Sequence, residues 1–327
     1  MIDDLENTLL NYTDQNLTKK PTRDGFGQGL LEIAKQNPNI VGLCADLTES
    51  TRMHWFAESF PERFIQVGVA EQNLIGVAAG LALEGKIPFA ASYAVFSPGR
   101  NWDQLRVSVC YSNSNVKVVG GHAGLTVGPD GATHQALEDI AITRVLPNLV
   151  VISPADSEQA RLATIAIANY EGPCYLRLSR EASPVFTTPK TTFEIGKAQI
   201  LKSGKDLTLI ATGPMVYNAL LVAENLKKDY SVEVINIHTI KPIDCDSIVK
   251  SAQKTKKVVT IEEHQINGGL GGAVAEVLSE QCPTPLLRIG MNDSFGQSGK
   301  AHELLDFYGL NVDKILEKVK IFLNEKI

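Results

Sequence analysis

Short β-rich runs alternate with helical patterns along most of the 327-residue chain, and this alternation restricts the fold more than any other feature. In the first half, strands are expected at residues 40–44, 64–68, 87–91, 116–120, 149–153 and 174–178. Helices are expected between them at residues 71–83, 102–111, 135–144 and 157–169. Such alternation is typical of βαβ units around a mostly parallel sheet, and it predicts an α/β fold.

A polar segment at residues 186–192, which contains a proline, interrupts this pattern and is expected to be part of a linker. A second series follows, with strands expected at 207–211, 232–237, 258–261 and 286–289, and helices at 214–226, 246–253, 271–280 and 300–307. The chain is also too long for one ordinary core. We therefore predict two consecutive, doubly wound, mostly parallel α/β domains at residues 20–186 and 193–325.

The composition, with 44% hydrophobic and 21% charged residues, describes a soluble globular protein. The net charge of −6 argues against general binding to nucleic acid or anionic membranes, because both need a basic surface. No apolar run approaches the length of a membrane span, and the acidic start lacks the basic region of a signal peptide. The five cysteines are widely spaced without a CxxC pair, so we expect buried free thiols in a reducing cytoplasm.

Glu71 stands where an expected strand ends and an expected helix begins. The helix dipole favours a carboxylate there, so a purely structural role is one interpretation. The rest of this helix, LIGVAAGLAL, lacks charged residues and is expected to be buried on most sides. A carboxylate at the mouth of a buried helix needs a hydrogen-bonding partner, and a ligand could supply it.

Tyr93, Phe96 and Trp102 form an aromatic run in a chain that is only 6% aromatic. They follow the expected strand at residues 87–91, at its carboxyl end, where open α/β sheets bind ligands. A floor of aromatic rings suits a flat heterocycle. Packing in the core is an equally good explanation for this segment taken alone.

His122, Asp130 and His134 lie in a loop, residues 120–135, that is rich in Gly, Thr and Pro and too irregular for a helix. Glycine-rich loops allow the backbone to approach a ligand closely. A single histidine is more often structural, but two histidines and an acid in one glycine loop favour a functional site. No third ligand is spaced to complete a zinc site, so we predict no metal site on this chain.

The second predicted domain carries fewer functional signals. Its segment NGGLGG, residues 267–272, is similar to a dinucleotide fingerprint, but Val274 stands where that motif needs glycine or alanine. We expect a turn of small residues at the start of a helix instead. Structural roles are expected for four polar residues near strand ends, namely His238, Glu262, Glu263 and His264.

Taken in order, these motifs resemble the C-terminal half of a transketolase, of the split type in which two genes encode one catalytic unit. The resemblance covers nearly the whole chain. It rests on residues 45–50 (ADLTES), 67–71 (VGVAE), 93–106, 122–134, 176–180 (LRLSR) and 238–244 (HTIKPID). It implies a pyrimidine-binding domain followed by a transketolase C-terminal domain.

The resemblance implies that thiamine diphosphate is the cofactor and that Glu71 donates a hydrogen bond to a ring nitrogen of its aminopyrimidine. A carboxyl group held in a dry pocket tends to stay protonated and can act as such a donor. Phe96 matches the aromatic residue that stacks on the aminopyrimidine, with Tyr93 and Trp102 as further walls. Asp46 matches an acid near the cofactor.

The same resemblance implies a substrate site. His122 and His134 match catalytic histidines that contact the substrate, and a histidine can move protons to and from an alkoxide near neutral pH. Asp130 matches an acid that contacts a hydroxyl of the ketose. The residues that match those holding the sugar phosphate are Arg23, Ser50 and Arg180, and guanidinium groups suit a phosphate.

One half of the implied active site is missing. Family members bind the diphosphate through a divalent metal on a Gly-Asp-Gly motif, and this sequence contains no such motif. The resemblance therefore implies a partner, an N-terminal transketolase subunit that carries Gly-Asp-Gly and most of the Mg²⁺ site. An α2β2 heterotetramer is the expected assembly, and it would transfer a two-carbon ketol unit between sugar phosphates.

Two other enzyme classes and one non-catalytic role stay open at this point. A subunit like the β chain of 2-oxoacid dehydrogenases would also lack the metal motif, but it would need no sugar-phosphate site. Deoxyxylulose phosphate synthase resembles the segment Thr133-His134-Gln135 but usually lacks a histidine at the position of His122. A scaffold that has lost activity is a third alternative, and the presence of Glu71 argues against it.

Overall fold

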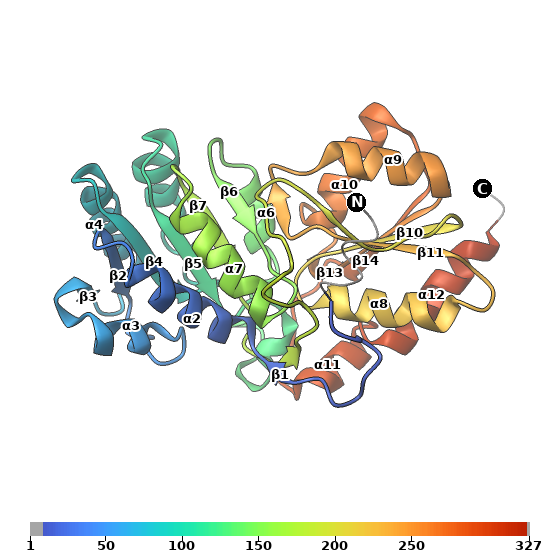
Figure 1. The fold of residues 1–327 in the computed structure, drawn as a ribbon, viewed down its shortest axis with the longest axis horizontal. Helices are drawn as coiled ribbons and strands as arrows, with labels where there is room; N and C mark the ends of the chain where they lie inside the picture. Colours follow the sequence, from blue (N-terminus) through green and yellow to red (C-terminus); the bar gives the residue numbers. More distant parts are fainter. Residues whose placement is uncertain (1–8, 326–327) are drawn as a thin grey trace.

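Two mostly parallel sheets, each with helices on both of its faces, make up the chain (Figure 1). The computed structural model describes residues 9–325. The first sheet contains β2 (Ile40–Cys44), β3 (Phe64–Gln66), β4 (Ile87–Tyr93), β5 (Lys117–Gly121), β6 (Val150–Ile152), β7 (Cys174–Arg177) and β12 (Thr239–Lys241). Their order is β12-β6-β7-β5-β4-β2-β3, and every neighbouring pair is parallel except β12 with β6.

The helices of the first sheet pack closely enough to require glycine. They are α2 (Thr22–Ala34), α3 (Met53–Ser59), α4 (Glu71–Leu83), α5 (Trp102–Gln104), α6 (Asp139–Arg144) and α7 (Ser157–Ala168), with a π-helix η2 (Leu105–Tyr111) and 3₁₀ turns η1 (Pro61–Arg63) and η3 (Leu125–Asp130). Helix α2 lies against α7 at Gly25, where a Cβ atom would lie 1.7 Å from the carbonyl oxygen of Ser157.

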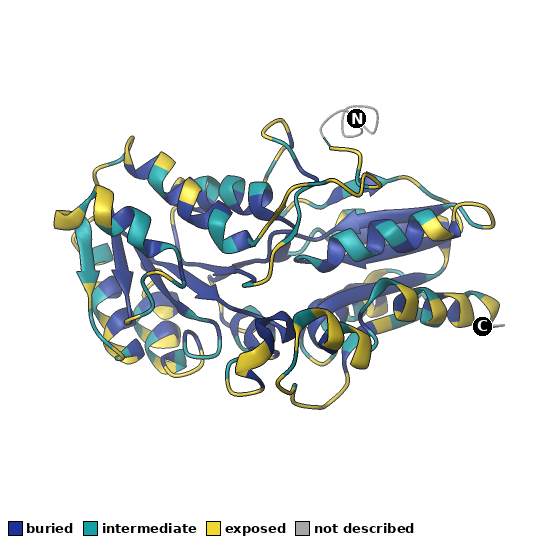
Figure 2. Cartoon of the chain, turned by 90° about the horizontal axis from the view of Figure 1, so that it is seen from below, coloured by how far each residue is buried: buried dark blue, intermediate teal, exposed yellow. Residues whose placement is uncertain are grey.

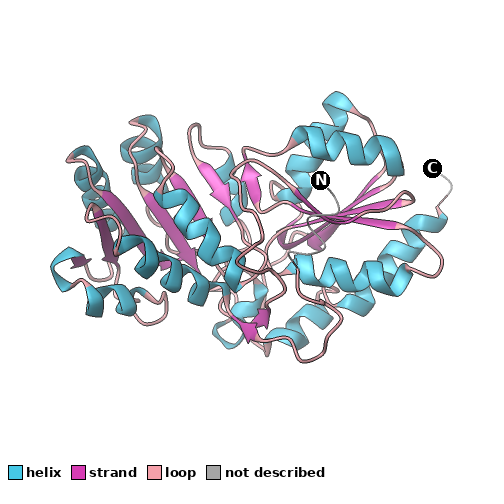
Figure 3. Cartoon of the chain, in the orientation of Figure 1, coloured by secondary structure: helices cyan, strands magenta, loops and turns pink. Residues whose placement is uncertain are grey.

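The second sheet has five strands in the order β14-β13-β10-β11-β9, in which β9 alone runs antiparallel to its neighbour. Its strands are β9 (Gln199–Lys202), β10 (Leu207–Ala211), β11 (Val232–Asn236), β13 (Val258–Gln265) and β14 (Leu286–Met291). Its helices are α8 (Met215–Leu226), α9 (Cys245–Thr255), α10 (Leu270–Gln281), α11 (Ala301–Phe307) and α12 (Val312–Asn324). Both sheets are buried between the helical layers, as Figure 2 shows. A separate ribbon pairs β1 (Lys19–Lys20) with β8 (Ser183–Pro184) (Figure 3).

The two halves of the chain are joined by a strand that crosses between them and by a common hydrophobic cluster. Strand β12 comes from the second half but pairs with β6 of the first sheet. One hydrophobic cluster contains both Tyr175 of β7 and Ile210 of β10. The expected linker at residues 186–192 is anchored at its start, because the buried Asp156 carboxylate accepts hydrogen bonds from the amides of Phe186 and Thr187, at 2.8 and 2.7 Å. The domain limits stay a prediction.

The predicted fold class is confirmed, and several single expectations need correction. The helix expected at residues 135–144 begins at Asp139, because the preceding residues continue the glycine loop. That loop contains no α-helix, but it does contain the 3₁₀ turn η3, kinked at Gly128, where φ is +78°. The five cysteines are free thiols, but only three of them are buried as expected, because Cys245 and Cys282 are partly exposed. Within residues 9–325, no helix has both the length and the apolar character to cross a membrane.

Candidate functional site

The residues singled out from the sequence gather at the carboxyl ends of the first sheet's strands. Tyr93 ends β4, His122 follows β5 directly, and Glu71 begins α4 shortly after β3. Parallel strands bring their carboxyl ends to one edge, so segments far apart in sequence meet there. This edge is where ligands bind in folds of this kind.

An aromatic cluster forms the centre of the site. The ring of Tyr93 stacks on His122, with centroids 3.9 Å apart and an interplanar angle of 23°. Phe96 lies beside Tyr93 at 5.9 Å, and His134 meets the Phe96 ring edge-on at 5.4 Å. The structure thus brings together two predicted cofactor residues and both predicted catalytic histidines.

The Glu71 carboxylate is 4% exposed and lies at the amino end of α4, as its position in the sequence indicated. Both carboxylate oxygens are 3.2 Å from Nη1 of Arg100. The same guanidinium lies over the Phe96 ring, with its carbon 4.1 Å from the ring centroid. Arg100 therefore connects Glu71 to Phe96, although it was not among the residues predicted from the sequence.

His122 is 2% exposed and has a positive φ of 56°. Burial, with a contribution from Arg23, lowers the pKa of His122 to about 3, so the ring is neutral at neutral pH. Nη1 of Arg23 lies 3.3 Å from Nε2 of His122. Because arginine can only donate, Nε2 must accept and the ring proton must sit on Nδ1. Nδ1 is buried and has no partner in the structure, so it is available to donate to a ligand.

A cavity of about 670 Å³ next to this cluster is lined by three cationic side chains, together with His302 and the acid Glu181. Arg23 and Arg180 line it from the first half of the chain, and Lys300 and His302 line it from the second. Nη1 of Arg23 also donates to the carbonyl oxygen of Ser50 at 2.9 Å, and its pKa is lowered by burial and by Arg52. Such a cluster suits a phosphate or another compact anion.

Other predicted site residues lie at the margin of this arrangement. The indole Nε1 of Trp102 donates to the carbonyl oxygen of Ile142 in α6 at 2.7 Å, which turns the side chain toward that helix. Asp46 is exposed beyond β2, and Asp130 is exposed at the end of η3. Ser50 meets Arg23 through its backbone, not its hydroxyl. The roles expected for these four residues stay predictions.

Sequence reasoning missed Arg100, Lys300 and His302. Arg100 carried a usable signal, since it follows Phe96 by four residues within the aromatic run. Lys300 and His302 carried none, because only the packing of the second half against the first brings them to the cavity. In the described part of the chain, no three His, Cys, Asp or Glu side chains are grouped to hold a metal ion.

Comparison with known proteins identifies the class to which this fold and site belong. The family model of the transketolase pyrimidine binding domain matches residues 18–185, and that of the transketolase C-terminal domain matches residues 196–315. These matches cover most of the chain and follow the two sheets in order. The chain belongs to the transketolase family.

Several relatives within this family have about the same length as this chain. A Methanocaldococcus jannaschii protein described as a transketolase C-terminal section is 51% identical over 92% of this chain and 95% of its own length. A 6-deoxy-6-sulfo-D-fructose transketolase subunit of Clostridium sp. (strain MSTE9) is 44% identical over 90% of this chain and 92% of its own. A solved structure, "Split gene transketolase, inactive beta4 tetramer", shares 46% identity and a TM-score of 0.88 and covers 94% of this chain and 99% of that chain.

Proposed function

We propose that this chain is the pyrimidine-binding subunit of a two-chain, thiamine diphosphate-dependent transketolase. One observation carries the proposal. Glu71, buried at the start of a helix, and the ring of Phe96 bind the same planar group, the Arg100 guanidinium, beside a cavity lined by Arg23 and Arg180. A site for a flat heterocycle thus lies next to a site for an anion.

The residues present fit the aminopyrimidine of the cofactor. Glu71 supplies a buried carboxyl group, and Phe96 supplies a ring face that already stacks with a planar group. When bound, thiamine diphosphate supplies a carbanion that accepts and releases the two-carbon unit. In this proposal Glu71 donates a hydrogen bond to a ring nitrogen, while Phe96 and Tyr93 orient the heterocycle.

The two histidines would handle the protons of the substrate. His122 is neutral, carries its proton on Nδ1 and lacks a partner there, so it can donate to a substrate oxygen. His134 is half-buried, with Nδ1 2.9 Å from the Thr133 hydroxyl, and its ring meets Tyr93 and Phe96 edge-on. In this proposal His122 donates a hydrogen bond to a substrate oxygen, while His134 takes up and returns the proton of the reacting hydroxyl.

The cationic cavity indicates a substrate with an anionic tail. Arg23 and Arg180 suit a phosphate, and they equally suit a sulfonate, which is also a compact tetrahedral anion. The Clostridium relative is named for a sulfonated ketose, which supports a wider choice of substrates than pentose phosphates. The donor is therefore proposed to be a ketose with a terminal phosphate or sulfonate.

A partner chain is part of the proposal. The sequence contains no Gly-Asp-Gly, so the diphosphate and its Mg²⁺ ion would be held mainly by a second subunit that carries this motif. Apolar side chains are exposed on α4 and the adjacent π-helix, including Leu83 at 75%, Tyr111 at 85% and Val107 at 43%. Such a surface is expected where another chain packs. An α2β2 assembly and a cytoplasmic location complete the proposal.

Co-expression with a candidate partner that bears Gly-Asp-Gly tests this function. The purified complex should transfer a ketol unit from xylulose 5-phosphate, or from a sulfonated ketose, to an aldose phosphate only when thiamine diphosphate and Mg²⁺ are added. Decarboxylation of pyruvate measured in parallel separates the alternatives. Turnover of pyruvate without ketol transfer would contradict the proposal and favour a dehydrogenase- or synthase-like subunit.

A further inference from the structure

Two consecutive buried acids in β13, Glu262 and Glu263, each accept hydrogen bonds from backbone amides at the start of a helical segment. The Glu262 carboxylate accepts hydrogen bonds from the amides of Leu270 and Gly271, both at 2.7 Å, and so caps α10 of its own sheet. This cap explains the turn of small residues at 267–272. Side chains alternate along a strand, so Glu263 points to the opposite face, toward the first sheet.

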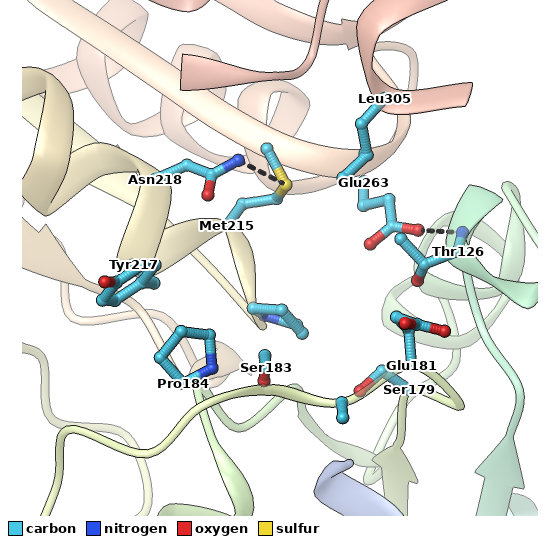
Figure 4. A pocket seen from close by; sticks show the side chains of 12 residues that line it. Thr126, Ser179, Glu181, Ser183, Pro184, Met215, Tyr217, Asn218, Glu263 and Leu305 are labelled. Carbon is cyan, nitrogen blue, oxygen red and sulfur yellow. Dashed lines mark hydrogen bonds between the residues drawn. The ribbon is translucent and has the colours of Figure 1, made fainter. Parts of the chain in front are cut away.

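Glu263 reaches across to the glycine loop of the active site. One of its carboxylate oxygens accepts a hydrogen bond of 2.6 Å from the amide of Thr126, in the first turn of η3. Figure 4 shows this bond between the two halves of the chain, at one wall of a pocket of about 150 Å³. The first amides of a helical turn have no partner within the turn, and Glu263 supplies one.

One glycine of the loop, Gly124, allows the backbone to approach Glu263 this closely. Gly124 has a φ of +88°, and a Cβ atom there would lie 2.4 Å from the Glu263 carboxylate. No other residue could bring the backbone so near the acid without displacing it. Gly269 stands in the same relation to Glu262, with 2.0 Å between its hypothetical Cβ and the carboxylate.

A second contact holds the other end of the loop. The side-chain amide of Gln135 donates to the carbonyl oxygen of Leu125 at 3.1 Å and to that of Gln297 at 3.0 Å. Gln297 belongs to the segment before α11, in the second half of the chain. The loop that carries Asp130 and His134 is thus fastened from the second half at two points.

Burying the carboxyl group of Glu263 costs free energy of folding. It is 3% exposed, and burial raises its pKa. The guanidinium of Arg177 pairs with Asp139 at 2.8 Å and donates to the backbone carbonyl of Glu263 at 2.9 Å. A buried carboxylate that bonds backbone amides without its own salt bridge fixes a conformation more than it adds stability.

We propose that Glu263 is a positioning residue of the active site, contributed by the second half of the chain. By holding the start of η3, it sets the loop so that His134 meets the rings of Tyr93 and Phe96. The holding of the loop stands on the contacts alone. Its effect on turnover rests on the proposed function.

Hydrogen–deuterium exchange on the full chain tests the holding directly. Glu263→Ala should make amides of residues 122–135 exchange roughly tenfold to hundredfold faster, because a buried hydrogen bond to the Thr126 amide is lost. Glu262→Ala is the matched control and should accelerate residues 266–275 while leaving residues 122–135 protected. Unchanged protection of residues 122–135 in Glu263→Ala, or the same loss there in Glu262→Ala, would overturn the proposal.

Kinetics of the complex with its partner test the consequence. Glu263→Ala should lower kcat/KM for the ketose by roughly tenfold to hundredfold and leave the Kd of thiamine diphosphate unchanged, because Glu71 and Phe96 lie outside the loop. Glu263→Gln keeps an acceptor oxygen and should recover part of the loss. Equal weakening of cofactor binding and turnover would indicate general damage and overturn the positioning role. A complex whose unaltered form has no ketol-transfer activity would reject the proposed function, while the exchange result would still stand.

Discussion

Arg100 uses one guanidinium group for two contacts, with the carboxylate of Glu71 and with the face of the Phe96 ring. Both are side chains that we propose to hold the aminopyrimidine. A guanidinium is planar and stacks on aromatic rings, so it can fill the position of a flat heterocycle. Arg100 is also half-exposed, so it can move away when the cofactor binds.

Removing this side chain should therefore help the cofactor. In the two-chain complex, Arg100→Ala should lower the Kd of thiamine diphosphate by about twofold to fivefold, because a partly exposed ion pair contributes at most about 1 kcal/mol. Titration calorimetry provides the measurement. Arg100→Lys keeps the charge but loses the planar group, and its Kd for thiamine diphosphate should lie between those of the unaltered protein and of Arg100→Ala. A higher Kd in Arg100→Ala would show that Arg100 binds the cofactor instead of competing with it.

Glu71, unlike Arg100, should be required for turnover. Glu71→Gln removes the acidic proton that we propose is donated to the cofactor, and it should reduce kcat by at least about a hundredfold. The helix start should tolerate the change, because glutamine has nearly the same shape. Turnover is measured on the reconstituted enzyme, and circular dichroism with thermal unfolding checks the fold. A variant that keeps most of its activity would reject this role.

At the scale of secondary-structure elements, the packing of α2 on α7 decides where Arg23 lies. Gly25 faces the backbone of Ser157, and Gly29 faces that of Arg161, where a Cβ atom would lie 2.7 Å from the carbonyl oxygen. Arg23 lies near the start of the same helix. The close contact between helices is thus linked to the anion site through the position of α2.

A single methyl group should disturb this contact. Gly25→Ala places a Cβ atom against backbone and should lower the free energy of unfolding by about 3 kcal/mol. Gly76→Ala is the matched control: apart from its chain neighbours and its own helix backbone, no atom of the described residues lies within 4 Å of the added Cβ, so helix propensity should raise stability by up to about 1 kcal/mol. Urea denaturation of the isolated chain measures both. Equal midpoints for the two variants would contradict this account of the packing.

The elements themselves were largely predictable from the sequence, and their exceptions have physical reasons. Strand β10 and helix α4 have the predicted limits, because each forms a clear apolar run with turn residues at its ends. Helix α2 was missed, since its three glycines disfavour a helix when viewed alone. Strand β12 is too short to give a pattern. The contacts of Arg100 and Glu263 depend on tertiary packing, which no local pattern encodes.

At the scale of the whole molecule, we propose that the chain offers one side of a cofactor site. Its described residues include a carboxyl group, aromatic rings and cationic side chains, but no group of metal ligands. The diphosphate carries much of the charge of thiamine diphosphate, so most of the binding energy is expected to come from the metal-bearing partner.

Binding to the isolated chain should consequently be weak. Titration of thiamine diphosphate with Mg²⁺ should give a Kd at least about a hundredfold higher than for the two-chain complex, because the charge-assisted contacts to the diphosphate are missing. Calorimetry at equal ionic strength compares the two. Tight, Mg²⁺-dependent binding by the isolated chain would contradict the division of the site between two subunits.

The exchange of β12 into the first sheet has a consequence for how such a protein can be taken apart. A break in the chain within residues 186–192 would leave that strand on one fragment and its neighbour β6 on the other. The first fragment would then expose an unpaired sheet edge, a template for self-association. A cut between the two halves should therefore give less soluble fragments than the intact chain. We expect the two halves to be produced successfully only as one polypeptide.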